Sequence, residues 1–165
     1  MESLKLKGTY HVECYGPDGQ LKWSDVIHNL VTTAGKNLAL DTILGNSAAG
    51  AVVMGLKGTG SAAAGDTQAS HAGWLEQGLA NAPTYTGNRP TPSFSAASAG
   101  SKATSAAVSF AITSSGTVSG CFINIGGSAT KDNTTGTLFS VGDFSGGDKT
   151  VANLDTINVT YTLTA

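Results

Sequence analysis

The chain has 165 residues and a formal net charge of −2, and only 12% of its residues are charged. The sequence contains no basic cluster, which argues against nucleic-acid binding because contacts with phosphate dominate that affinity. No apolar run is long enough to span a membrane as a helix, and the start MESLKLKG lacks the apolar core of a signal peptide. We therefore expect a product made in a cytoplasm.

The composition predicts one domain over residues 1–165, built of closely packed strands and turns. The charged share is about half of the usual value, and Ser, Thr, Ala and 22 glycines fill the difference. The two cysteines, Cys14 and Cys121, fall in predicted strands. A disulfide would require those strands to be neighbours with suitable geometry, so we expect two reduced, semi-buried thiols that act as small hydrophobic residues.

An N-terminal hairpin is predicted over residues 3–30. Apolar and polar residues alternate over residues 4–15, as in a half-buried strand. Gly16-Pro17-Asp18-Gly19 supplies the turn. The return strand then carries Leu21, Trp23 and Ile27 on one face.

A short helix is predicted next, at about residues 33–44. Thr32 or Thr33 is its N-cap, and Gly45 ends it. A helix of about three turns is marginal alone, so its apolar stripe is expected to pack on a sheet. That stripe consists of Ala39, Leu40, Ile43 and Leu44.

The remaining strands are expected within residues 51–165. A buried strand is predicted at 51–56, a weaker one around 83–86, and a flexible low-complexity connector at 95–104. Short β-branched segments separated by turns indicate a sandwich or barrel, so the predicted class is mainly β with one short helix. Further strands are predicted at 108–112, 118–125, 138–144 and 157–164.

Two segments invite a catalytic or nucleotide-binding interpretation that their details do not favour. The glycine-rich residues 55–60 contain Lys57, but a phosphate loop needs its lysine after the last glycine. His71 precedes Glu76, and such a pair can perform acid–base chemistry. The sequence shows neither a nucleophile nor a metal partner for this pair.

The remaining polar candidates are best explained as surface and turn residues. His11 and His28 flank the hairpin turn and are expected to be solvated. The aspartates of the last third match no calcium loop, and aspartate is favoured in turns. We therefore expect no enzymatic activity, no metal and no cofactor. The aspartates concerned are Asp132, Asp143, Asp148 and Asp155.

Three stretches resemble a family of small virion proteins from tailed bacteriophages. The first is KLKGTYHVECYGPDGQLKWSDVIHNLVTTAGKNLALDTILG, in which the second strand ends in Asn-Leu-Val-x-x-x-Gly-x-Asn before a short helix. The second is MGLKGTGSAAAGDTQASHAGWLE, with its glycine-rich strand end, Asp-Thr and Trp-x-Glu. The third is the closing strand DTINVTYTLTA.

The resemblance implies a capsid cement, or head decoration, protein with a jelly-roll-like antiparallel β-sandwich. Such proteins lie on the outer surface of the virion capsid, where they bind the major capsid protein and stabilise the expanded head. They self-associate, often as dimers or trimers. The resemblance implies no catalytic residue.

Four residues are candidate anchors of the partner interface, because aromatic residues and arginine dominate binding hot spots. At least one of the two tryptophans is expected to be plain core. The alternative is a phage tail protein of the fibre or baseplate, and a less favoured one is a carbohydrate-binding module. The four anchors are Trp23, Trp74, Tyr85 and Arg89.

Overall fold

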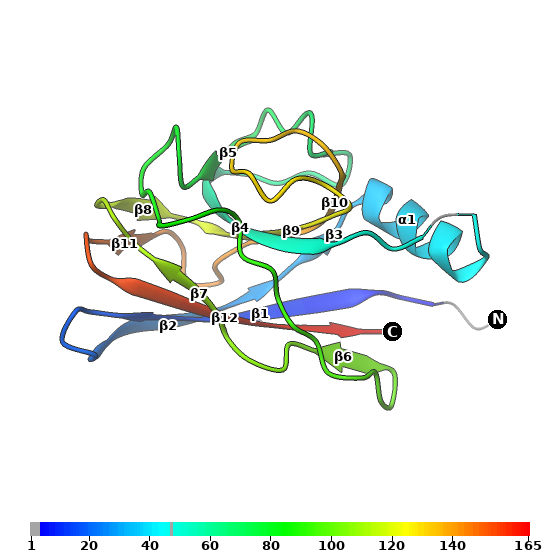
Figure 1. The fold of residues 1–165 in the computed structure, drawn as a ribbon, viewed down its shortest axis with the longest axis horizontal. Helices are drawn as coiled ribbons and strands as arrows, with labels where there is room; N and C mark the ends of the chain where they lie inside the picture. The colour runs from blue at the N-terminus through cyan, green and yellow to red at the C-terminus, as the bar shows by residue number, and fades with distance from the viewer. Residues whose placement is uncertain (1–3, 47) are drawn as a thin grey trace.

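The computed structural model describes residues 4–46 and 48–165. Two antiparallel sheets lie face to face in a sandwich-like arrangement, and the described residues form one helix, α1 (Figure 1). The prediction of a mainly β protein with one short helix is confirmed. The strands and the helix are β1 (Lys7–Tyr15), β2 (Leu21–His28), β3 (Leu30–Val31), α1 (Thr33–Ile43), β4 (Val52–Gly60), β5 (Trp74–Gln77), β6 (Ser101–Ala103), β7 (Val108–Ala111), β8 (Gly116–Val118), β9 (Gly120–Ile125), β10 (Thr137–Asp143), β11 (Lys149–Val151) and β12 (Thr156–Thr164).

The first sheet is built around β1 and β12, which join distant parts of the chain. These strands pair from Lys7 opposite Thr164 to Tyr15 opposite Thr156. β2 pairs with the other edge of β1, while β6 and β7 both pair with β12. The predicted hairpin is confirmed in β1 and β2, although Ser3, its predicted first residue, lies outside the described residues.

The second sheet has the order β3-β10-β9-β4-β5. Its central strand β9 is almost wholly buried, as predicted for an apolar strand covered on both faces. β8 and β11 form a separate two-stranded sheet. The jelly-roll connectivity expected from the family resemblance is not confirmed by these strand orders.

The core lies between the two sheets and consists mainly of their inward-facing side chains. Tyr10 of β1 and Ile157 of β12 are fully buried in it, together with Ile123 of β9. The hydroxyl of Tyr10 lies 2.6 Å from Ser140 Oγ of β10, which links the layers by a hydrogen bond. Burial raises the pKa of Tyr10 well above its usual value, so this hydroxyl stays neutral.

Two predictions for the middle of the chain are wrong. Residues 83–86 form no strand, because only Tyr85 makes an isolated bridge, to Ile112. Residues 95–104 are not a free connector, since β6 lies within them and pairs with β12. Their low complexity hid this strand, because these residues pair with β12 through their backbone and show no apolar alternation in the sequence.

The thiols of Cys14 and Cys121 are free and buried, as expected for reduced cysteines. Burial and the nearby Asp155 carboxylate raise the pKa of Cys14 to about 11. Burial also raises the pKa of Cys121. Because only a thiolate reacts readily, both residues act as apolar core groups.

The first turn of α1 is fastened directly to β10. Thr32, its N-cap, is fully buried and accepts a hydrogen bond from Gly35 N at 2.9 Å. The Thr32 hydroxyl donates to the Leu138 carbonyl oxygen at 2.5 Å, and Thr32 N donates to the Phe139 carbonyl oxygen at 3.1 Å. Helix and strand approach closely because Gly35 has no side chain: a Cβ there would collide with the Phe139 backbone.

Gly35→Ala is expected to lower the free energy of unfolding by about 1–3 kcal/mol, since the added methyl group meets backbone that cannot yield easily. This loss outweighs the gain in helix propensity of about 1 kcal/mol. Urea denaturation measures the difference. The control is Gly65→Ala, because a Cβ at this position would meet open space. This substitution is expected to change the free energy of unfolding by at most about 0.5 kcal/mol. Equal stability of the two variants would contradict the close contact.

Candidate interaction surface

The four predicted anchors lie mostly inside the chain. Trp74, Tyr85 and Arg89 are each at most 3% exposed. Only Trp23, on β2, is partly exposed; its ring meets Phe144 edge-on, with ring centroids 5.4 Å apart. Three of the four side chains therefore hold the fold together and present almost no surface to a partner.

Trp74 begins β5 and belongs to a small second core. Its ring stacks on His71 with ring centroids 4.0 Å apart, and its Nε1 donates to Asp66 Oδ2 at 2.9 Å. Phe122 lies against the same ring. The packing role considered for this tryptophan is therefore confirmed, and His71 is occupied as its stacking partner.

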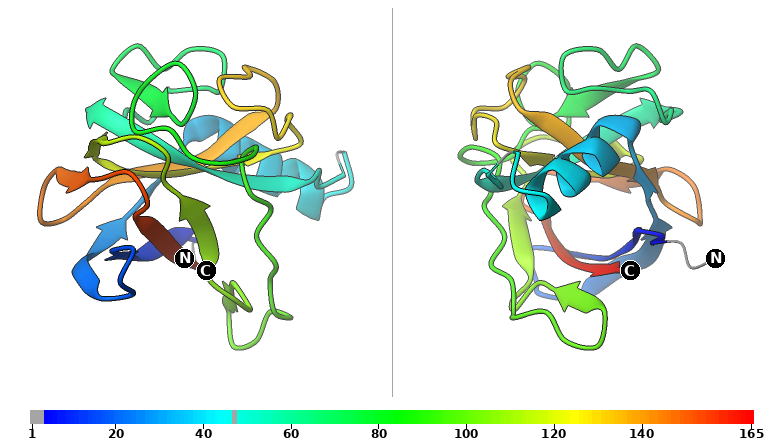
Figure 2. Two further views of the ribbon diagram at one scale, coloured as in Figure 1. Left: turned by 60° about the vertical axis from the view of Figure 1, so that its left-hand side comes forward. Right: turned by 90° about the vertical axis from the view of Figure 1, so that its right-hand side faces the viewer.

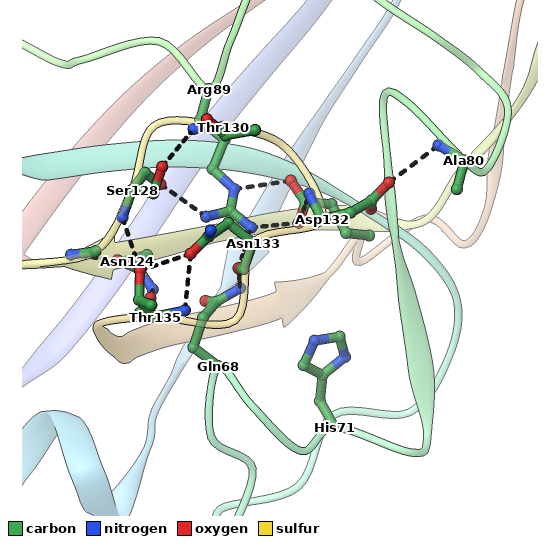
Figure 3. A network of polar contacts seen from close by, with 12 residues as sticks. Gln68, His71, Ala80, Arg89, Asn124, Ser128, Thr130, Asp132, Asn133 and Thr135 are labelled. Carbon is green, nitrogen blue, oxygen red and sulfur yellow. Dashed lines mark hydrogen bonds and ion pairs between the residues drawn. The ribbon is translucent and has the colours of Figure 1, made fainter.

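Arg89 and Glu76 form a buried, bidentate ion pair. Arg89 Nε and Nη2 donate to the two carboxylate oxygens of Glu76 at 2.8 and 2.5 Å. The same guanidinium donates to the carbonyl oxygens of Ser128 and Asn133 at 3.0 and 2.8 Å (Figure 3). Glu76 also accepts from Asp132 N at 3.0 Å. One ion pair thus joins β5, the following loop and the β9–β10 loop.

Tyr85 packs next to this pair. Its ring meets Phe110 edge-on at 5.0 Å between centroids, and Lys131 Nζ lies 4.3 Å from its centre on another side. Lys131 Nζ also donates to the Tyr85 carbonyl oxygen at 2.6 Å. Burial and the carboxylate of Glu76 raise the pKa of Tyr85, so its hydroxyl stays neutral.

His71, Glu76 and Asp132 line one hollow of about 170 Å³, but Glu76 is paired with Arg89, and His71 Nδ1 lies 3.0 Å from the Trp74 carbonyl oxygen. The remaining polar candidates lie apart from this hollow. Lys57 is buried in β4 and pairs with Asp143 at 2.5 Å, so it is committed to an ion pair. His28 lies opposite Thr9, and His11 lies opposite Val26. Over residues 4–46 and 48–165, no group of three or more His, Cys, Asp or Glu side chains could hold a metal ion.

The exposed part of α1 was not anticipated. Gly35, in the first turn, is the one buried residue of α1. The apolar stripe was expected to pack on the sheet, and this prediction is wrong for three of its four residues: Leu40 is 53% exposed, Ile43 66% and Leu44 79%. Ala39, the fourth, is half-buried. The second half of the helix projects from the end of the sandwich that also carries the C-terminus (Figures 1 and 2).

A groove lies beside this helix and is called the α1 groove. It consists of two adjoining hollows of about 430 and 470 Å³, and both are lined by Leu6, Ala39 and Ile43. One wall is α1, and the other is formed by residues 4–7 and the end of β12. Its main apolar side chains are Leu4, Leu6, Leu40, Ile43, Phe139 and Leu163.

Lysines border the groove. Lys5, Lys7 and Lys36 line the first hollow, and Lys102 lines the second. The sequence carries a signal for this surface in the alternation Leu4-Lys5-Leu6-Lys7 and in the helix stripe. The same patterns are typical of ordinary core packing, so sequence reasoning assigned them to the interior.

Comparisons with known proteins identify no relative. No protein-family model matches the chain, and neither a curated protein nor a solved structure matches it. Among the residues that the structure describes, no helix is long and apolar enough to cross a membrane.

Glu76→Gln is expected to destabilise the protein by about 3–5 kcal/mol, because it leaves the buried Arg89 charge without a counter-charge. Urea denaturation measures the loss. Glu13→Gln is the matched control: its side chain is exposed and bonds only the Tyr15 hydroxyl among the described residues. A loss below about 1 kcal/mol for Glu76→Gln, the size typical of surface pairs, would contradict the structural role given to this ion pair.

Proposed function

We propose that the chain is a bacteriophage virion structural protein that acts as a capsid cement protein. It binds the outer face of the coat lattice and stabilises the expanded head. The proposal is supported by the resemblance of three stretches to phage virion proteins, at residues 5–45, 54–76 and 155–165.

The structural observation that carries the proposal is the α1 groove. Monomeric proteins seldom expose a contiguous large apolar patch unless it binds something. Here Leu4, Leu40 and Ile43 are each more than half exposed around one groove. Such a surface suits a protein whose work is to adhere to another.

A cement protein needs only modest affinity at each contact. A lattice presents the same site many times, and self-association into a dimer or trimer multiplies the attachment points. A rigid sandwich holding one apolar contact surface at its end fits this mode of binding. The major capsid protein is the proposed partner.

The test uses heads of the parent phage prepared with and without the protein. Purified protein is expected to bind expanded heads lacking it, measured by co-sedimentation. Those heads are expected to release DNA at a lower temperature than complete heads, measured by a DNA-binding dye during heating. Absence of binding together with equal thermal release would overturn the proposal.

Copy number provides a second measurement. Quantitative gels of purified virions are expected to give hundreds of copies, as lattice decoration requires. A few to a few dozen copies would instead indicate the tail protein, fibre or baseplate, considered as the alternative.

A further inference from the structure

We propose that the α1 groove binds a peptide segment of a partner protein that is both apolar and acidic. The proposal deepens the proposed function, and rests on it only for the identity of the partner, which would be the coat protein. The chemistry of the segment follows from the groove itself.

The first argument is the distribution of cationic side chains. Of the nine Lys and Arg residues, four form ion pairs with carboxylates within the described chain. A fifth, Lys131, is buried and donates to the Tyr85 carbonyl oxygen. The four that remain are without an ion pair among the described residues, and all four line the α1 groove: Lys5, Lys7, Lys36 and Lys102. Of these, Lys102 is held at the surface by a hydrogen bond from its Nζ to the Ser95 carbonyl oxygen at 3.0 Å.

The second argument is the absence of compensating charge. Among described residues, the lining of both hollows includes no aspartate or glutamate. The chain as a whole has a net charge of −2, so the lining of the groove differs in sign from the whole chain. An apolar floor bordered by lysines is complementary to apolar side chains flanked by carboxylates.

The third argument concerns the backbone of residues 4–6. These residues continue the line of β1, yet within the described chain their backbone groups take part in no hydrogen bond. An extended segment lying along them would gain backbone hydrogen bonds, as in the addition of a strand to a sheet edge. Its alternate side chains would enter the groove between residues 4–7 and α1.

Other occupants fit less well. A second copy docking the same groove would bring two sets of four lysines together, and like charges facing each other across an interface are costly. A membrane surface reaches protruding apolar side chains, whereas Leu6, Phe139 and Leu163 lie in a hollow. A peptide segment can enter that hollow.

The experiment uses the full chain and three fluorescein-labelled peptides. One alternates Leu and Glu, the second alternates Leu and Lys, and the third alternates Ser and Glu. Fluorescence anisotropy is expected to show binding of the Leu-Glu peptide alone, with affinity that falls as salt is raised. Amide chemical shifts are expected to change at residues 4–7 and in α1. Equal binding of either other peptide, or no binding of any, would overturn the proposal.

Variants locate the site. Lys5→Glu/Lys36→Glu and Ile43→Ser are each expected to weaken binding of the Leu-Glu peptide by at least about tenfold. Leu75→Ser is the apolar control, because Leu75 is 59% exposed on β5, away from the groove. Gln20→Glu/Asn153→Glu is the charge control at exposed positions. Binding unchanged in the groove variants, or equally weakened in the controls, would overturn the proposal.

Further arms separate the other occupants and the proposed function. If the protein does not bind the Leu-Glu peptide but is retained on phosphatidylglycerol vesicles, the proposal is overturned in favour of a membrane. If it does not bind the peptide but sediments as a dimer that Ile43→Ser abolishes, the proposal is overturned in favour of a second copy. Heads that bind the unchanged protein and Lys5→Glu/Lys36→Glu equally would overturn this inference and leave the cement function standing. Binding of the Leu-Glu peptide without binding to heads would overturn the cement function and leave the peptide-binding inference standing.

Discussion

The pairing of β1 with β12 is the constraint on which the rest of the structure depends. Nine consecutive residue pairs join the strand that begins at Lys7 to the strand that ends at Thr164. The chain between them adds β2, β6 and β7 to this sheet and builds the second sheet before it returns to β12. Contacts so distant in sequence slow folding, because the loop must close before the pairing stabilises it. Once formed, the pairing places the start of β1, the end of β12 and α1 at one end of the sandwich.

The positively charged side chains differ between the α1 groove and the rest of the described chain. Away from the groove, cations are matched: Arg89 with Glu76 and Lys57 with Asp143, in buried or half-buried pairs that hold loops and strands in place. At the groove, lysines remain unmatched beside exposed leucines and Ile43. The paired charges stabilise the fold. The lysines without an ion pair, beside exposed apolar side chains, can form ion pairs with a bound partner.

The sequence predicted the fold well where the signals were local. The alternation of β1 and β12, the Pro17-Asp18 turn and the Thr32 cap each depend on neighbouring residues, and each is found. The sequence predicted poorly which side chains are exposed, because exposure depends on contacts with residues far away in the sequence. Trp74 and Arg89 are residue types that are common at interfaces, yet both are buried. Trp74 packs on Phe122, and Arg89 is paired with Glu76. Leu40 and Ile43 have the periodicity of core residues, yet Gly35 in the first turn is the one residue of α1 that is buried, and it lies against β10.

The position of Ala165 has a practical consequence for attaching other proteins. Ala165 lines a hollow shared with Leu6 and Lys102, next to the α1 groove, so a reporter fused after it would crowd the docking surface. The turn at residues 16–20 lies at the far end of β1, whose nine residues at about 3.3 Å each span about 30 Å. The turn and α1 lie at opposite ends of the ribbon (Figure 1). A reporter inserted between Pro17 and Asp18 would therefore leave the groove beside α1 open.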